Sequence, residues 1–546
     1  MEAMKISHRW FLPLLMNIQR SKNMPKTPSI KLFHLIKSLT GSEKRYFKLF
    51  VKDTGGKTSK YIQLFEAIEK QETFDDEALR ALVYPLENIQ SRKYSELKAY
   101  LYELILKSLQ SYDEKTSIEY KLQHILSSIK VLFKRALFED CKELLTKGTK
   151  LAKKYEQFNA LLKIMDWEKQ IAYAETDIQY LDKYLSKIQA QETQALSQIE
   201  NRAIYENIFY QLLIGLRKDS SLRRPEQRDR LLKLLDHPQL NGVDQALSHQ
   251  AKVLYYRIYT FYYYTIGDFD SFYKTGVLLL DIMEAAPHFL KESVTNYISA
   301  LSNLLVGCIL SFDYDQAEVY LKKLKAIKPI SADDKLKIHR QYYTVKFRLC
   351  INTGAFEEGL KALEEHLTLL ASGNVNSKIF ETESFYFQYI CIYFGTGVYD
   401  KALDYLNRWL NSPKSIERQD LQSFARMINL IIHYEMGNHL LLDSLLRSTY
   451  RFLNNRNSLY QMEARMITFI RDVNHAQDRK TRETVLYGFK RELINQMEDK
   501  KVKAMLQLFD LEAWLDSKIL NMSFAEVVER KFLQEKQKVK FTNHTN

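Results

Sequence analysis

The chain is poor in the two residues that most often interrupt helices. It contains 16 Gly and 9 Pro in 546 residues, against 35 Tyr and 29 Phe. Glycine and proline are the strongest local breakers of regular structure. So few of them in so long a chain predict helices throughout, and the hydrophobic fraction of 46% is typical of a folded, water-soluble protein.

Cysteine is scarce as well. Cys141, Cys308, Cys350 and Cys391 are isolated from one another, and no Cys-x-x-Cys pair occurs. Each lies in an apolar or amphipathic stretch, which favours buried, reduced thiols over a redox or metal site. We therefore expect a reducing compartment, with the cytoplasm as the default.

Long hydrophobic runs are absent too. No stretch of about 18 apolar residues occurs, so the sequence predicts no membrane span. The apolar run Trp10–Met16 contains Pro13 and lacks a small-residue cleavage site, which argues against a signal peptide. Residues 1–23 are unlike the helical sequence after Met24, and we expect a poorly ordered extension, or a spurious one if translation begins at Met24.

The body of the chain carries no excess charge of either sign. Residues 1–60 hold 13 Lys or Arg and 3 Asp or Glu, and residues 531–546 hold 4 and 1. Residues 61–530 hold 63 of each. A protein wrapped in nucleic acid along its length would need a basic body. Only the basic N-terminus is compatible with a nucleic-acid partner.

Signatures of catalysis and of metal binding are missing. The twelve histidines are scattered, and no pair at i, i+4 lies beside a carboxylate. There is no Gly-x-Ser-x-Gly and no Gly-rich phosphate loop. We expect neither an enzyme nor a bound cofactor or metal.

What the chain does contain is a short signal repeated five times between residues 267 and 442. Each copy has a turn, an aromatic residue two positions on, and usually a small residue three positions after that. The copies read Gly267-Asp-Phe269, Phe312-Asp-Tyr314, Gly354-Ala-Phe356, Gly397-Val-Tyr399 and Gly437-Asn-His439. Their spacing of 40 to 45 residues indicates a stacked helical repeat.

This signal resembles the turn of the tetratricopeptide repeat family. Glycine permits the left-handed conformation that ends a first helix, an aromatic residue fills the wedge between the helices, and a small residue lets them approach. The small residues here are Ala317, Gly359 and Ala402, whereas the fifth copy has His439 and Leu442. The period exceeds the family's usual 34, and the first-helix glycine is replaced, so we expect a divergent variant with longer helices. The replacing residues are Thr260, Leu305, Phe347, Ile390 and Leu430.

The resemblance implies an all-α, right-handed solenoid of antiparallel helix pairs, preceded by an N-terminal helical domain. We divide the chain accordingly. The expected parts are the extension 1–23, a basic N-terminal helical domain 24–115, a long-helix segment with weak repeat character 116–250, tetratricopeptide-like repeats 251–455, C-terminal capping helices 456–532 and a disordered tail 533–546. Within the N-terminal domain, the spacing of Thr40 and Glu43 predicts a capping box.

The family binds peptides mostly on a concave face lined by first helices, so the resemblance implies a protein or peptide partner there. Positions ten and six residues before each turn are the groove-facing offsets, and the family's carboxylate-clamping residues are absent from them. The offsets hold Arg257, Phe261, Ser302, Val306, Thr344, Arg348, Phe387, Cys391, Met427 and Ile431. We take Arg257, Phe261, Thr344, Arg348 and Phe387 as candidate groove residues, with ordinary helix-surface positions as the alternative.

A second candidate surface lies in the basic N-terminal domain. Lys44, Arg45, Lys48 and Lys52 surround Tyr46 and Phe47 in one predicted helix. Such a patch suits nucleic-acid phosphates or an acidic partner. Solvated lysines beside a small apolar core give the same pattern. The expected function is therefore a non-enzymatic binding scaffold, with a repeat-containing regulator that contacts nucleic acid as the alternative.

Overall fold

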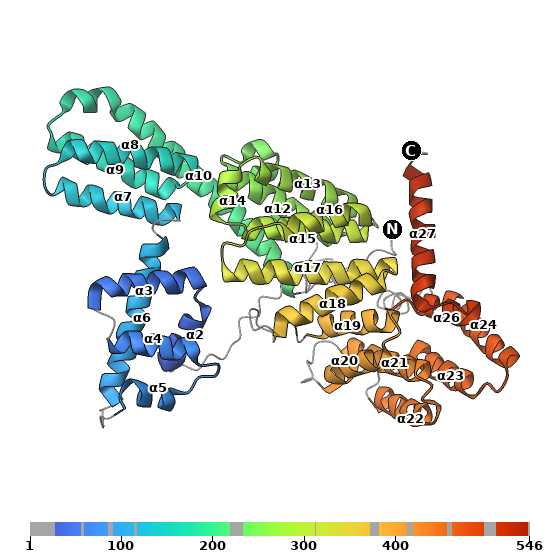
Figure 1. Cartoon of the computed structure of the whole chain (residues 1–546). Helices are drawn as coiled ribbons and strands as arrows, with labels where there is room; N and C mark the ends of the chain where they lie inside the picture. Colours follow the sequence, from blue (N-terminus) through green and yellow to red (C-terminus); the bar gives the residue numbers. More distant parts are fainter. Residues whose placement is uncertain are drawn as a thin grey trace.

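The computed structural model is helical wherever it describes the chain (Figure 1). It describes residues 28–55, 59–85, 91–113, 117–218, 233–311, 313–371, 380, 382–411, 419–455, 461–495 and 509–543. Within these ranges every regular element is an α-helix or a short 3-10 helix, and no strand occurs. The predicted all-α class is confirmed. The predicted extension 1–23 lies outside the described residues.

The N-terminal helices form a group with its own core. They are α2 (Pro28–Ser38), α3 (Gly41–Gly55), α4 (Lys60–Lys70), α5 (Asp76–Val83) and α6 (Ser91–Asp113). Ile36, Val51, Leu64 and Leu101 are buried in this core. The predicted capping box is confirmed, because Thr40 N donates to Glu43 Oε2 at 2.6 Å and Glu43 N donates to Thr40 Oγ1 at 3.3 Å.

Four long helices come next along the chain. They are α7 (Ile118–Phe133), α8 (Phe138–Lys154), α9 (Phe158–Ala174) and α10 (Ile178–Lys218). The last has 41 residues and reaches the repeat region, where it packs on α12 (His249–Ile266). The Glu156 carboxylate, in the α8/α9 turn, accepts from the amides of His249 at 2.6 Å and Gln250 at 3.0 Å. It thereby caps α12 and fixes one end of the α7–α10 bundle against the repeats.

The helices from α12 to α24, which we call the repeat region, form a succession in which each except α14 packs on the one that follows it (Figure 1). After α12 come α13 (Phe269–Glu284), α14 (Pro287–Glu292), α15 (Thr295–Leu310), α16 (Tyr314–Lys325), α17 (Ala332–Thr353), α18 (Phe356–Ala371), α19 (Glu383–Gly395), α20 (Tyr399–Asn411), α21 (Gln419–Glu435), α22 (His439–Asn455), α23 (Gln461–His475) and α24 (Arg479–Asn495). Helices two apart also touch, as α15 does α17 and α17 does α19. None of the described helices has the length and apolarity needed to cross a membrane.

The predicted turns lie between consecutive helices of the structure. Gly267, Gly354, Gly397 and Gly437 have φ of 77°, 78°, 76° and 69°. In each case a new helix begins two residues later, as it also does at Tyr314. Left-handed backbone ends the first helix there, as the glycines predict. The fifth predicted turn residue, Phe312, lies outside the described residues.

The chain ends in two helices that return to the middle of the repeat region. These are α26 (Leu511–Leu520) and α27 (Phe524–Asn543), which we call the C-terminal strap. α26 packs on α24, whereas α27 crosses to α17 (Figure 1). We expected a disordered tail from residue 533. The described residues instead remain helical to Asn543, because Phe532 and Lys536 contact Tyr314 and Asp315 of α16.

Candidate interaction site

The predicted groove residues on α12 face another helix of the chain. The Arg257 guanidinium lies over the Phe209 ring of α10, with Cζ 4.2 Å from the ring centroid. Phe261 meets the same ring edge to face at 5.3 Å. Burial lowers the pKa of Arg257 to about 10. These two side chains therefore join α10 to α12 instead of lining an open groove.

The groove residues on α17 and α19 lie in the interior. Thr344 and Phe387 are buried. The carbonyl of Thr344 accepts a hydrogen bond from Gln388 Nε2 at 2.9 Å, which joins α17 to α19. Burial lowers the pKa of the Arg348 guanidinium, and Tyr314 and Cys391 lie close enough to oppose part of that shift. These positions hold the stack together.

The remaining offsets are interior as well. Ser302, Val306, Cys391, Met427 and Ile431 are all buried. Every residue of α15 from Ala300 to Leu310 is buried, so this helix has no solvent-facing side over that stretch. The positions that we expected to line a groove are buried in the structure, and one reason accounts for all of them. The sequence pattern assigns them to one helix face, and the structure covers that face.

Two lysines of the basic N-terminal patch share one carboxylate. Lys48 Nζ lies 2.9 Å and Lys44 Nζ 3.5 Å from the Glu69 carboxylate on α4. Burial alone would raise the pKa of Glu69, but the two lysines outweigh it and hold that pKa below its ordinary value. Lys37 Nζ also donates to the Glu69 carbonyl at 2.8 Å. These lysines close the C-terminal end of α4.

Two members of the patch remain. Arg45 is exposed and donates from Nε to the Gly41 carbonyl at 3.4 Å within its own helix. Lys52 lies in α3, and its side chain is outside what the structure describes. Among the described members of the patch, Arg45 and Lys48 are thus exposed, and Lys44 and Lys48 are engaged in ion pairs with Glu69.

Sequence reasoning missed a buried polar chain between α17, α18 and α19. His339 Nε2 lies 3.0 Å from His366 Nδ1, and His366 Nε2 lies 2.6 Å from the Tyr389 hydroxyl. Burial lowers the pKa of His339 to about 4, and burial together with His339 lowers that of His366 to about 3. Both rings are therefore neutral near pH 7. The three residues are far apart in sequence, so no local spacing predicts that they meet.

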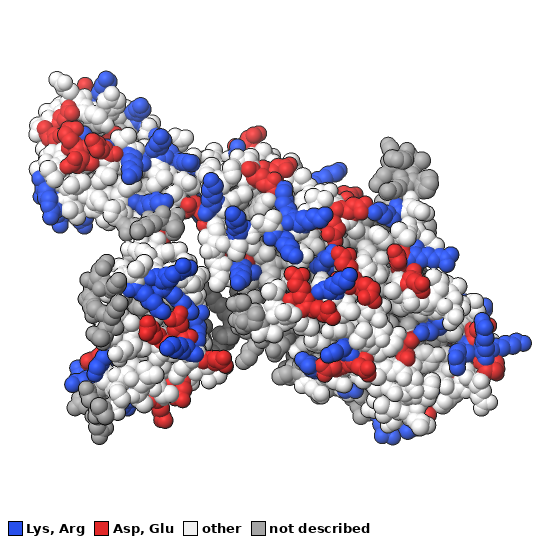
Figure 2. All heavy atoms as spheres, in the orientation of Figure 1, with Lys and Arg blue, Asp and Glu red and all other residues white. Residues whose placement is uncertain are grey.

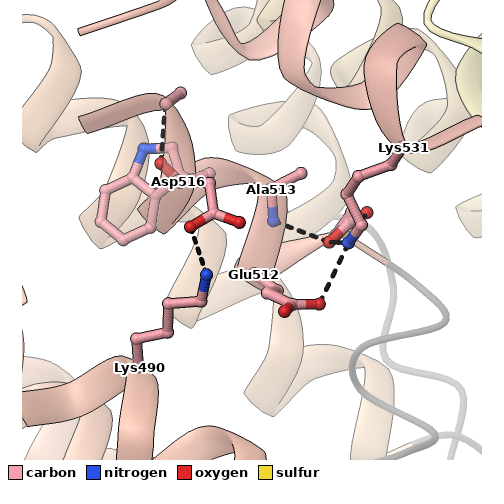
Figure 3. Close-up of polar contacts among 8 residues, drawn as sticks. Lys490, Glu512, Ala513, Asp516 and Lys531 are labelled. Atoms are coloured by element: carbon pink, nitrogen blue, oxygen red, sulfur yellow. Dashed lines mark hydrogen bonds and ion pairs between the residues drawn. The ribbon is translucent and has the colours of Figure 1, made fainter. Parts of the chain in front are cut away.

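The C-terminal strap is held by ion pairs that sequence reasoning also missed (Figure 3). Lys531 Nζ lies 2.8 Å from Asp510 Oδ2 and 3.1 Å from Glu512 Oε2, joining α27 to the start of α26. Asp510 Oδ1 also accepts from Ala513 N at 2.8 Å and so caps α26. Burial would lower the pKa of Lys531, but the two carboxylates raise it above its ordinary value.

The strap contacts residues at or beside four successive helix-to-helix turns. Glu435, at the end of α21, accepts from Trp514 Nε1 and from Lys518 Nζ, each at 2.6 Å. Phe394 of α19 and Phe356 of α18 both meet the Phe524 ring, at 5.3 and 5.6 Å. With Gly354 and Tyr314, these contacts make one continuous seam along the turns.

The described residues contain no group of three or more His, Cys, Asp or Glu that suits a metal ion. All four cysteines are free and buried. No protein-family model matches the chain, and no curated protein matches it either.

Proposed function

We propose that the chain is a non-enzymatic scaffold, a right-handed solenoid of antiparallel helix pairs of the tetratricopeptide type that binds another protein or a peptide. The supporting observation is the recurrence of one local geometry. A left-handed glycine ends one helix, and the next helix begins two residues later, at Gly267, Gly354, Gly397 and Gly437. Stacked units of this kind provide extended surfaces whose parts keep a fixed spacing.

The strap supports the same proposal because it restrains the stack. Glu435, Phe394, Gly354 and Tyr314 belong to successive turns, and all four meet α26, α27 or the residues just before them. Rigid surfaces lose less conformational entropy on binding. The partner is bound on exposed faces, since the first-helix offsets are interior. We place this scaffold in the cytoplasm, which suits its four free thiols.

The test is reconstitution. Proteins cross-linked to the tagged chain in cells are identified, purified and titrated against the purified chain by sedimentation velocity. We expect a saturable complex of fixed stoichiometry that Leu301→Asp abolishes, because Leu301 is buried in α15. The double charge reversal Glu357→Lys/Asp400→Lys, at exposed positions of α18 and α20, is the control for folding and charge. If no protein binds the purified chain saturably, the scaffold proposal is wrong.

A further inference from the structure

The free end of the α7–α10 bundle exposes apolar side chains to water. Tyr173 is 80% exposed and Ile178 is 69% exposed, on either side of the α9/α10 turn. Leu137, in the α7/α8 turn, is 45% exposed. The two turns lie at the same end of the bundle, because Lys142 of α8 contacts Glu175 of the α9/α10 turn at 2.8 Å. Single exposed apolar residues are ordinary, but several at one end mark an interaction site.

This end is held in one shape before any partner arrives. The Phe133 ring contacts Phe138 at 5.6 Å and Trp167 at 5.2 Å, which ties the ends of α7 and α8 to α9. Asp177 Oδ1 accepts from Tyr180 N at 2.9 Å and caps α10. A surface fixed in advance loses little entropy when it is covered.

The charge around the apolar residues is negative. The exposed acidic side chains at the start of α8 and around the α9/α10 turn are Glu139, Asp140, Glu143, Asp177 and Asp182. Figure 2 shows acidic side chains gathered at this end of the bundle. Lys142 Nζ forms ion pairs with Glu139 and Glu175, at 2.8 Å each. Residues 134–143 and 173–183 hold six carboxylates against the four cations Lys134, Arg135, Lys142 and Lys183, so the net charge of this end is negative.

We propose that this surface, the acidic tip, binds a basic amphipathic segment of another protein. The acidic tip comprises Leu137, Asp140, Glu143, Tyr173, Ile178 and Asp182. Apolar side chains of the segment cover Tyr173 and Ile178, and its Lys or Arg side chains face the carboxylates. The inference rests on the proposed scaffold function and names the chemistry of one partner.

Charge complementarity selects this occupant over a second copy of the chain. Two acidic tips brought together would oppose like charges across an interface, which disfavours self-association. A basic segment gains from the same field, which speeds its encounter with the tip and weakens as salt rises. The tip is also at the end of the bundle opposite the Glu156 contact with α12, and the described helices of the repeat region lie away from it (Figure 1).

The experiment is a fluorescence-anisotropy titration of the whole chain with two synthetic helical peptides. One has leucines on one face and lysines on the other, and the second replaces each lysine by glutamate. We expect the basic peptide to bind at least about tenfold more tightly, with affinity falling as salt rises. Tyr173→Ser/Ile178→Ser lowers that affinity about tenfold or more, because two apolar anchors are lost.

Matched variants separate the tip from the rest of the surface. Asp140→Lys/Glu143→Lys reverses two tip charges and lowers the affinity for the basic peptide about tenfold. Glu357→Lys/Asp400→Lys makes the same charge change in the repeat region and leaves the affinity unchanged. Leu440→Ser, at a 95% exposed position of α22, is the apolar control.

Three results overturn the inference. The peptides bind equally well, the tip variants bind like the unaltered chain, or Tyr173→Ser/Ile178→Ser dissociates a dimer of the chain in sedimentation equilibrium. The scaffold proposal fails separately, when no saturable protein partner exists. If a reconstituted partner binds the tip variants as tightly as the unaltered chain, the proposed role of the acidic tip is wrong, but the scaffold proposal is not affected.

Discussion

Gly354 and Glu529 are in backbone contact, although 175 residues separate them. A Cβ placed on Gly354 would come within 2.6 Å of the Glu529 amide nitrogen and 3.0 Å of the Ala525 carbonyl oxygen. Gly354 also has φ of 78°. The same glycine therefore ends α17 and admits the C-terminal strap, which reaches this turn because no side chain intervenes.

We predict that Gly354→Ala displaces α27. The left-handed backbone costs about 1–2 kcal/mol for a residue with a Cβ, and the clash with Glu529 adds about 1–3 kcal/mol more. Gly397→Ala is the control, because Gly397 has φ of 76° and a Cβ placed on it would meet open space. Hydrogen exchange measured by mass spectrometry should show lost protection over α27 in Gly354→Ala alone. Equal protection in both variants would contradict the contact.

A second prediction concerns the other end of the strap. Glu435→Gln keeps an oxygen for Trp514 Nε1 but removes the charge that faces Lys518 Nζ at 2.6 Å. The Glu435 side chain is largely buried, so an uncompensated lysine should cost about 1–3 kcal/mol. The measurement is amide protection of α26. In the control Glu512→Gln, Lys531 keeps Asp510, so α26 should change by less than about 0.5 kcal/mol.

Local signals account for the parts of the fold that the sequence predicted well. The turn glycines and the Thr40 and Glu43 capping box each depend on residues a few positions apart. Cap and turn chemistry acts over that range, so one sequence suffices to read it. The candidate groove and the tail required knowledge of which faces meet.

Long-range packing decides those features. Phe387 and Thr344 read as one face of a first helix, but the opposing helices cover that face. The polar chain through His339, His366 and Tyr389 joins three helices, and the strap joins Lys536 to Asp315, 221 residues away. No periodicity encodes such pairs. The glutamate that pairs with Lys44 and Lys48 likewise lies on another helix.

The polar chain predicts acid sensitivity of α17–α19. The folded-state pKa of His366 is about 3 and that of His339 about 4, both below the ordinary value. The unfolded chain therefore binds protons that the folded chain excludes. The contribution of the two histidines to the free energy of unfolding is fully present above about pH 6.5, and it is lost as the pH falls towards their folded-state pKa values. For His366 the loss is about 2 kcal/mol at pH 5. Glu365 opposes the shift of His339, and Lys335 adds to it.

The measurement is hydrogen exchange of α17–α19 amides at pH 7.5 and pH 5, corrected for intrinsic rates. His366→Gln keeps a donor and an acceptor but does not titrate. It should be less stable at pH 7.5 and lose less stability between the two pH values. An unchanged pH dependence in His366→Gln would show that another histidine, such as His339, controls the acid response.

The basic patch requires variants that distinguish binding from folding. Lys44→Glu/Lys48→Glu sets two new carboxylates against Glu69, so protection of α4 should fall by about 0.5–1 kcal/mol. Arg45→Glu changes an exposed residue and should leave α4 unchanged. We expect no steep salt-dependent binding of duplex DNA by the unaltered chain. Such binding, if Arg45→Glu removed it, would establish the nucleic-acid alternative.

The last prediction concerns backbone strain at the acidic tip. Thr176 has φ of 58°, a left-handed conformation that β-branched residues rarely adopt, whereas the described repeat turns place glycine there. Thr176→Gly should relieve about 1–2 kcal/mol of strain, less about 0.5–1 kcal/mol for the greater freedom of glycine in the unfolded chain. Amide protection at the end of α9 should therefore rise by up to about 1.5 kcal/mol. Thr176→Ala keeps the Cβ and should gain less than Thr176→Gly, and equal gains would assign the strain to the Thr176 side-chain branches and not to its backbone.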